Sequence, residues 1–189
     1  MKRKPTLAGL VARPLLAGAI AAGATAPAAA VDDIFLKLDG IEGEAQDSKH
    51  KNEIDVLSYT QAFRNAGAKF TGGGAATGKV TCGSVTVLKN IDKASPQLIE
   101  AVVLGKHIKK GVITFRKAGK DQLEYYVVTM NDVFVEAIDQ TDTPDASLIV
   151  ERVSLNAAQF DFRYTPQKED GTAGAPELFS FDCVTQKAN

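Results

Sequence analysis

Apolar and polar residues alternate along most of the chain after residue 31, which is the pattern of half-buried β-strands. Ile34, Leu36 and Leu38 give the first example, with their side chains on one face of a short run. The runs predicted as strands are 34–38, 54–63, 79–89, 111–117, 123–130, 132–138, 148–164 and 178–184. A slip in the alternation at Gly83 predicts a bulge in the run 79–89. The pattern predicts a mainly β protein.

Helical periodicity is found in the stretch from Ser95 to Gly105. Ser95 is predicted to be the N-cap, Pro96 suits the first helical position, and Leu98 and Val102 recur at helical spacing. Gly105 is predicted to end the helix. Many strands with one helix predict a β-barrel or sandwich with a helix packed on it.

The first thirty residues have the three parts of a secretory signal peptide. A basic start precedes an apolar run, 14–24, and small residues at 28–30 then fit cleavage between Ala30 and Val31. The alternative is a membrane anchor, but the apolar run is shorter than the roughly 20 residues that span a bilayer. We therefore expect a signal peptide over 1–30, one mature domain over 31–189, and no stable membrane anchor after cleavage.

Removal of this segment changes the charge of the chain, whose full sequence has a formal net charge of −1. The segment holds four basic residues and no acidic one, which leaves 18 basic and 23 acidic residues and a formal charge of −5. Nucleic-acid binding requires clustered Lys and Arg, so this acidic balance predicts no nucleic-acid partner.

Two cysteines, Cys82 and Cys183, remain in the mature chain. In an exported protein they are disulfide candidates, and the bridge would close a loop of about 100 residues, worth up to about 4.7 kcal/mol in the chain-entropy model. Two buried free thiols are the alternative. No metal-ligand spacing surrounds either cysteine, there is no G-x-S-x-G motif, and Val80 breaks a superficial phosphate-loop pattern. The sequence predicts no enzyme activity and no cofactor.

Several blocks, in order and well spaced, resemble the haemolysin-coregulated protein (Hcp) family, whose members form the tube of bacterial type VI secretion. The blocks are DDIFLKLDGIEGEAQDSKHKNEIDVLSY at 32–59, IDKASPQLIEAVVLGKH at 91–107, TFRKAG at 114–119, EYYVVTMNDVFVEAI at 124–138 and ERVSLNAAQFDFRYTPQKEDG at 151–171. The resemblance implies a two-sheet β-barrel with one flanking α-helix in a Gram-negative bacterium. It implies homo-hexameric rings that stack head to tail, carry secreted effector proteins and meet a spike protein.

Ring formation makes two loops candidates for contacts between subunits. The glycine-rich segment with Gly72, Gly73 and Gly74 is an arm that reaches a neighbour or, alternatively, a plain surface loop. Asp47 and His50, in the polar stretch 42–52 predicted as a solvated loop, would contact an adjacent ring or face solvent. Tube subunits of this family are usually loaded from the cytoplasm and carry no cleavable signal. The predicted signal peptide and the cysteine pair are therefore departures from the family pattern. We therefore expect an exported, ring-forming structural protein of the periplasm or the exterior; the alternative is an exported β-barrel that binds or converts another molecule without a tube role.

Overall fold

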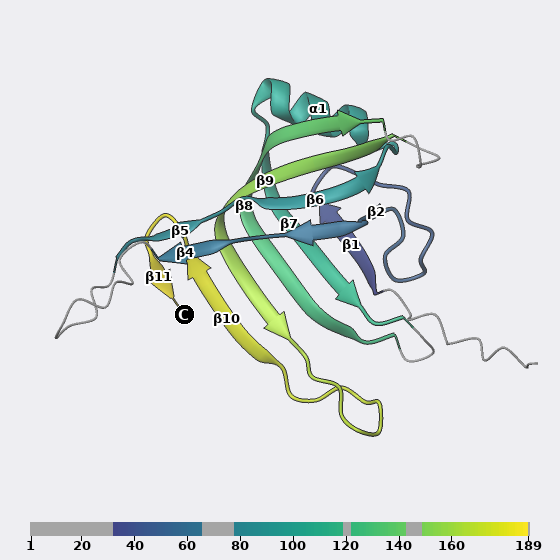
Figure 1. The fold of residues 1–189 in the computed structure, drawn as a ribbon, viewed down its shortest axis with the longest axis vertical. Coiled ribbons are helices and arrows are strands. Elements are labelled where there is room, and N and C mark those ends of the chain that lie inside the picture. The colour runs from purple at the N-terminus through teal and green to yellow at the C-terminus, as the bar shows by residue number, and fades with distance from the viewer. Residues whose placement is uncertain (1–31, 66–77, 119–121, 143–148, 189) are drawn as a thin grey trace, which may run out of the picture.

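The computed structural model describes residues 32–65, 78–118, 122–142 and 149–188. The predicted signal peptide, its cleavage site and the glycines at 72–74 lie outside the described residues. The elements are β1 (Asp33–Leu38), β2 (Ile54–Asp55), β3 (Ser58–Thr60), β4 (Phe63–Asn65), β5 (Val80–Cys82), β6 (Val85–Asn90), α1 (Ser95–Leu104), β7 (His107–Arg116), β8 (Glu124–Thr141), β9 (Val150–Tyr164), β10 (Glu177–Asp182) and β11 (Lys187–Ala188). The prediction of a mainly β fold is confirmed, with one helix in the described part of the chain (Figure 1).

A short segment that changes its partner strand closes the barrel. Strands β1, β7, β8, β9 and β6 pair in that order, every pair antiparallel. The gap between β1 and β6 is bridged by β2, which pairs with β1, and by β3, which pairs with β6. The change occurs between two residues: the Val56 amide donates to the Ile34 carbonyl (2.9 Å), and the Leu57 amide donates to the Leu88 carbonyl (2.7 Å). The prediction of one strand over 54–63 is therefore wrong, because this stretch is divided among β2, β3 and β4.

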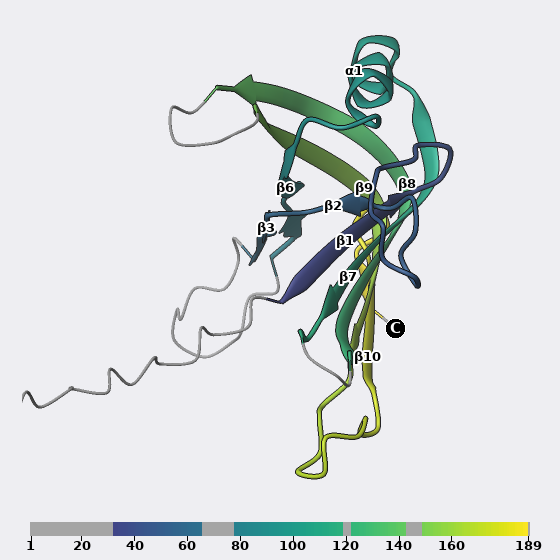
Figure 2. The same cartoon turned by 90° about the vertical axis from the view of Figure 1, so that its right-hand side faces the viewer.

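Strands β8 and β9 are long enough to run from the closed barrel into the part of the sheet that carries β10 (Figure 2). The start of β9 pairs with β6, and its end, from Gln159 to Tyr164, pairs with β10. In β8 the register with β9 shifts between Val135 and Ala137, and Asp132 has a positive φ of 55°. These irregularities let one strand continue where we predicted two, 123–130 and 132–138, so that division is wrong.

The core lies inside the closed barrel, where the inward positions of the alternating strands meet. Residues with no exposed surface come from every wall: Leu36, Ile54, Val87, Ile113, Val128, Met130, Val153 and Leu155. The apolar face predicted for 34–38 is confirmed at Leu36 and Leu38, which are buried, and Ile34 is half-buried. The run 79–89 ends its first strand at Cys82 and resumes at Val85, so Gly83 separates β5 from β6 where a bulge was predicted.

Helix α1 covers the barrel at β8 (Figure 1), and its own Leu98 and Ala101 are buried on the side that faces the barrel. Its end agrees with the prediction: Gly105 has φ 60°, and the following amide, of Lys106, donates to the Ala101 carbonyl (2.9 Å). Its beginning does not. Ala94 is the N-cap residue, and its methyl side chain cannot accept a hydrogen bond; the Ser95 hydroxyl instead donates to Glu151.

That hydroxyl belongs to a buried polar network that joins β6, β9 and α1. Lys89 Nζ lies 2.8 Å from Glu151 Oε2 and 2.8 Å from Asp92 Oδ1, and Lys89 and Glu151 have no exposed side-chain surface. Ser95 Oγ donates to Glu151 Oε2 (2.6 Å), and Gln140 Nε2 donates to Oε1 (2.6 Å). Burial alone would raise the pKa of Glu151, but the hydrogen bonds from Lys89, Ser95 and Gln140 outweigh it and lower the pKa below its usual 4.5.

We expect Lys89→Met to lower the free energy of unfolding by about 3–5 kcal/mol, because Glu151 would remain buried without its cation. Chemical denaturation at neutral pH measures this loss. The control is Lys93→Met, which removes the exposed pair with Glu42 (3.1 Å) and should cost under about 1 kcal/mol. The double change Lys89→Met with Glu151→Leu should recover much of the loss. Equal effects of the two single changes would contradict a structural role for the network.

Candidate assembly surfaces

The polar stretch 42–53 folds back as a hairpin against the body of the protein. The Gly43 amide donates to the Asn52 carbonyl (2.8 Å), and the Ala45 amide donates to the Glu53 carbonyl (3.0 Å). The chains approach so closely that a Cβ at position 43 would lie 2.3 Å from the Glu53 carbonyl oxygen, so only glycine fits there. The prediction of a wholly solvated loop is wrong, since Ala45 and His50 are buried.

His50 points into the protomer. Its ring stacks on Phe35, with centroids 4.3 Å apart and planes 7° from parallel. Its Nδ1 lies 2.9 Å from Glu53 Oε2, and its Nε2 lies 3.6 Å from Glu124 Oε1. With 6% of its surface exposed, His50 holds the hairpin to β1 and β8. Its contact with an adjacent ring stays a prediction.

Asp47 fixes the same hairpin from its other side. Its Oδ1 accepts hydrogen bonds from the amides of Lys49 (2.9 Å) and His50 (3.2 Å), and its Oδ2 lies 2.8 Å from Arg116 Nη1. Burial would raise the pKa of Asp47, but these amides and the Arg116 guanidinium lower it. The guanidinium is 3% exposed and also pairs with Asp33 (2.8 Å), so Arg116 ties the hairpin to β1. A role for Asp47 between rings likewise stays a prediction.

We expect Asp47→Ala to lower the free energy of unfolding by about 1.5–3 kcal/mol at neutral pH, because hydrogen bonds to a charged group are lost. The folded-state pKa of Asp47 lies below its usual 3.8, so its contribution is complete above that value and disappears as the pH falls through the lowered one. Urea denaturation at a series of pH values should show the wild type and the variant converging in acid. Lys49→Ala, an exposed change in the same hairpin, should be near neutral; a cost equal to that of Asp47→Ala would contradict the assignment.

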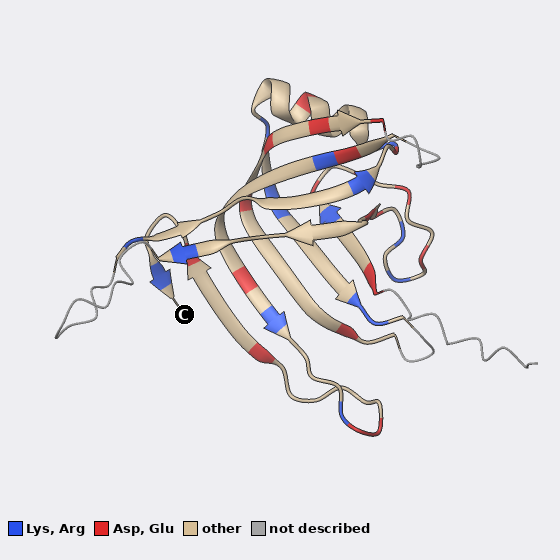
Figure 3. Cartoon of the chain, in the orientation of Figure 1, with Lys and Arg blue, Asp and Glu red and all other residues tan. Residues whose placement is uncertain are grey.

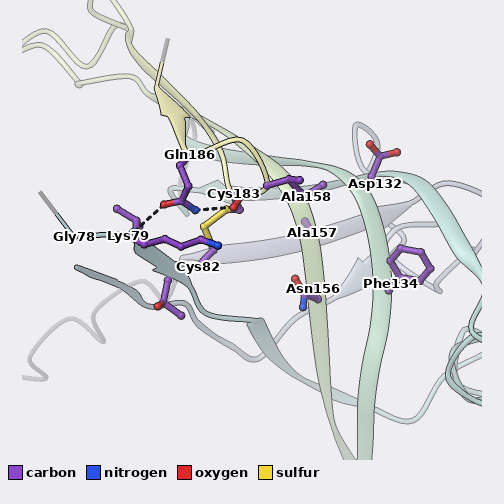
Figure 4. A pocket seen from close by; sticks show the side chains of 13 residues that line it. Gly78, Lys79, Cys82, Asp132, Phe134, Asn156, Ala157, Ala158, Cys183 and Gln186 are labelled. Atoms are coloured by element: carbon purple, nitrogen blue, oxygen red, sulfur yellow. Dashed lines mark hydrogen bonds between the residues drawn. A yellow bond between two sulfur atoms is a disulfide. The ribbon is translucent and has the colours of Figure 1, made fainter. Parts of the chain in front are cut away.

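A disulfide joins the two predicted cysteines, Cys82 at the end of β5 and Cys183 after β10. Strands β4 and β5 pair with each other as a separate two-stranded sheet, which we call the stem. Figure 4 shows the bridge beside Gln186, whose Oε1 accepts from the Val80 amide (2.8 Å) and whose Nε2 donates to the Cys183 carbonyl (2.7 Å). The stem is thus attached to the turn 183–186.

Two concavities adjoin the stem. A surface hollow of about 960 Å³ has the disulfide in its wall and includes Lys79, Asp132, Phe134 and Val184 (Figure 4). A second, apolar groove of about 560 Å³ is lined mostly by aromatic rings, from Tyr59, Phe63, Tyr126, Phe162, Phe179 and Phe181. The groove lies on the face of β8, β9 and β10 beyond the closed part of the barrel.

The edge of the sheet lies next to this groove. Strand β10 pairs with β9 on one side, while β11 covers only Phe181 and Asp182 on the other. Among the described residues, no strand pairs with the outer side of 177–180. Leu178 and Phe179 are 72% and 50% exposed. This edge was not predicted, although two consecutive large apolar residues in an alternating strand require one of them to face outward.

A further apolar surface lies at the end of α1, where Val103 and Leu104 are 74% and 63% exposed. Charges of both signs are interspersed over the described strands rather than gathered by sign (Figure 3). In the described part of the chain, no cluster of three His, Cys, Asp or Glu side chains could hold a metal ion. No helix there has the length and apolar character needed to cross a membrane.

Comparison with known proteins decides the family. The family model described as "Type VI secretion system effector, Hcp" matches residues 35–164. The chain belongs to the Hcp family. The protein hcp1 of Pseudomonas aeruginosa is 36% identical over 152 residues, which are 79% of this chain and 94% of that protein. Hcp1 of Salmonella typhimurium superposes with a TM-score of 0.68 at 31% identity, over 84% of this chain and 99% of that structure.

A solved type six secretion system protein is more similar in shape, with a TM-score of 0.80 at 25% identity over 84% of this chain and all of the other. The predicted Hcp fold is therefore confirmed. Membership in the Hcp family, whose members are structural subunits of the type VI secretion tube, makes this chain a structural protein and not an enzyme. Its surfaces for contact with other chains then become the functional site.

Proposed function

We propose that this chain is an exported Hcp subunit that assembles into homo-hexameric rings in the periplasm or outside the cell. The observation that carries the proposal is the family match over 35–164, combined with a free sheet edge beside an apolar groove. Signal-peptide removal, export and the number of subunits are parts of the proposal. Ring stacking, effector proteins as cargo and a spike protein as partner are further parts, and they rest on the family alone.

The surfaces of the protomer suit head-to-tail contact. Closed rings need two different, complementary surfaces on each subunit, related by a rotation that closes. The β10 edge, with Leu178 and Phe179, offers unpaired main-chain groups and apolar side chains together. The end of α1, with Val103 and Leu104, is a separate convex apolar surface. Contiguous exposed apolar residues of this kind mark protein interaction sites, so we place the subunit contact at the β10 edge.

Expression of the full chain in a Gram-negative host tests the proposal directly. We expect the protein in the periplasmic fraction, with Val31 as its first residue by N-terminal sequencing. Native mass spectrometry of that material should give the mass of six processed chains. A protein that stays monomeric at high concentration would contradict assembly, and an uncleaved cytoplasmic protein would contradict export.

A charge at the β10 edge should weaken the ring. We expect Leu178→Asp to raise the concentration for half-assembly at least about tenfold, because a carboxylate would be desolvated in an apolar contact. Its thermal stability as a protomer should change little, since Leu178 is 72% exposed. The matched control is Ala175→Asp, which places the same charge on the exposed loop before β10. Light scattering over a concentration series measures both variants, and equal assembly of the two would place the contact elsewhere.

A further inference from the structure

The attachments between the stem and the rest of the protein converge on a few residues. Strands β4 and β5 form no ladder with the nine-stranded sheet in the described part of the chain. Between described residues, the stem is joined to the turn 183–186 by the disulfide and by the Val80–Gln186 hydrogen bond, and Phe63 and Cys82 pack on the body. The Phe63 ring meets Phe160 and Phe162 edge-on, at 5.5 and 5.7 Å, and is itself 41% exposed. The disulfide is thus the covalent link between the stem and this turn, beside a hydrogen bond from Val80.

The turn 183–186, by contrast, is well fixed without the disulfide. The Asp182 carboxylate accepts from the amides of Val184 (2.9 Å) and Thr185 (2.7 Å), which shapes the turn. The Cys183 amide donates to the Ala158 carbonyl of β9 (2.8 Å), which attaches it to the sheet. The covalent bond thus connects the stem to a turn that is held on β9.

The stem also forms a wall of both concavities. Phe63 and Val80 line the apolar groove, and Lys79, Val80 and Cys82 line the larger hollow. Phe179 belongs to the groove and to the exposed edge of β10. If the stem moved away from the turn, the groove beside the proposed subunit contact would lose one wall.

We propose that the Cys82–Cys183 bond controls assembly: oxidation of the two thiols locks the stem in place and completes the surface for a second copy. The inference rests on the proposed function, because it requires that copies associate. The oxidant that forms this bond is a molecule with a disulfide of its own, which reacts by thiol–disulfide exchange.

The oxidation is a balanced exchange. The thiolate of one cysteine attacks a sulfur of the oxidant's disulfide, forms a mixed disulfide and releases the oxidant's other sulfur as a thiolate. The second cysteine then attacks the mixed disulfide, which forms the Cys82–Cys183 bond and releases the oxidant as a dithiol. Two electrons and two protons leave the protein. Both cysteines are partly exposed, so an oxidant can reach them.

The pair joins distant parts of the chain. The two cysteines are 101 residues apart, and the Cys183 amide is held by the Ala158 carbonyl of β9. The folded barrel therefore holds Cys183 in the place that the bond requires. A protein kept in a reducing compartment would fold its barrel yet leave the stem loosely attached.

The test uses the full chain, expressed for export and purified from the periplasm. Labelling under denaturing, non-reducing conditions should first find no free thiol; two free thiols would overturn the proposal. The protein is then reduced with dithiothreitol under native conditions, with circular dichroism to follow the fold. A Cys82→Ser/Cys183→Ser variant provides the permanently reduced form. Leu36→Ala, which truncates a fully buried core side chain on β1, a strand that pairs with β2 and β7, is the control for general destabilisation.

We expect the reduced protein and the double variant to need at least about tenfold higher concentration for half-assembly by light scattering. Glutathione disulfide should restore the wild type and leave the double variant unchanged. Leu36→Ala should assemble like the wild type wherever it is folded. Unchanged assembly on reduction would overturn the proposal.

Hydrogen exchange tests whether the disulfide fixes the stem, independently of assembly. On reduction, the amides at 80–82 should exchange at least about tenfold faster while those of β7 and β8 keep their protection. Unchanged exchange at 80–82, or loss of protection throughout β8, would contradict a local lock. If the oxidised wild type is monomeric, the proposed function fails, and the exchange experiment still decides whether the disulfide fixes the stem.

Discussion

The long antiparallel pairing of β8 with β9 is the interaction on which the rest of the structure depends. One end of this pair supports β6 and the closed barrel, and the other supports β10 and the exposed edge. Helix α1 packs on β8, and the Cys183 amide is held by β9. The β8–β9 pair therefore supports the core, the helix, the disulfide and the proposed contact surface. The bulge near Val135 lets the pair bend between the barrel end and the end that carries β10.

Polar groups inside this protein attach irregular segments rather than perform chemistry. Lys89 and Glu151 connect the start of α1 to two strands, and Arg116 with Asp47 connects the hairpin 42–53 to β1. Buried ion pairs of this kind add little net stability but are costly to break singly, so they favour one arrangement of the segments that they join. The outer surface is thereby presented in a fixed geometry, which suits a protein that contacts copies of itself.

Local signals in the sequence predicted what depends on local structure. The alternation of apolar residues indicated the buried face of β1, and the glycine at 105 indicated the end of α1, because each reflects geometry within a few residues. The division of 54–63 into three strands was not visible, since the change of partner strand after Val56 depends on hydrogen bonds to β1 and β6. Ser95 looked like a cap because its competing acceptor, Glu151, is distant in sequence.

The candidate surfaces show the same limit. The cysteine pair was identifiable because export and an even count suffice to suggest it, whereas the inward turn of His50 requires Phe35, Glu53 and Glu124 to be assembled around it. A charged stretch with alternating signs is normally solvated, and here it is folded against an aromatic ring and a buried guanidinium. Burial of polar groups by tertiary contacts is what single-sequence patterns least reveal.

Barrel closure by distant partners has a kinetic consequence. Val85 lies opposite Leu155, and Asp33 opposite Arg116, so the pairs that complete the barrel bring together residues widely separated along the chain. Folds dominated by such non-local pairing cross their folding barrier slowly, in milliseconds to seconds. The newly made polypeptide therefore remains unstructured for longer than a helical bundle of similar size, and for that time it is a suitable substrate for any translocation channel that accepts only extended chains.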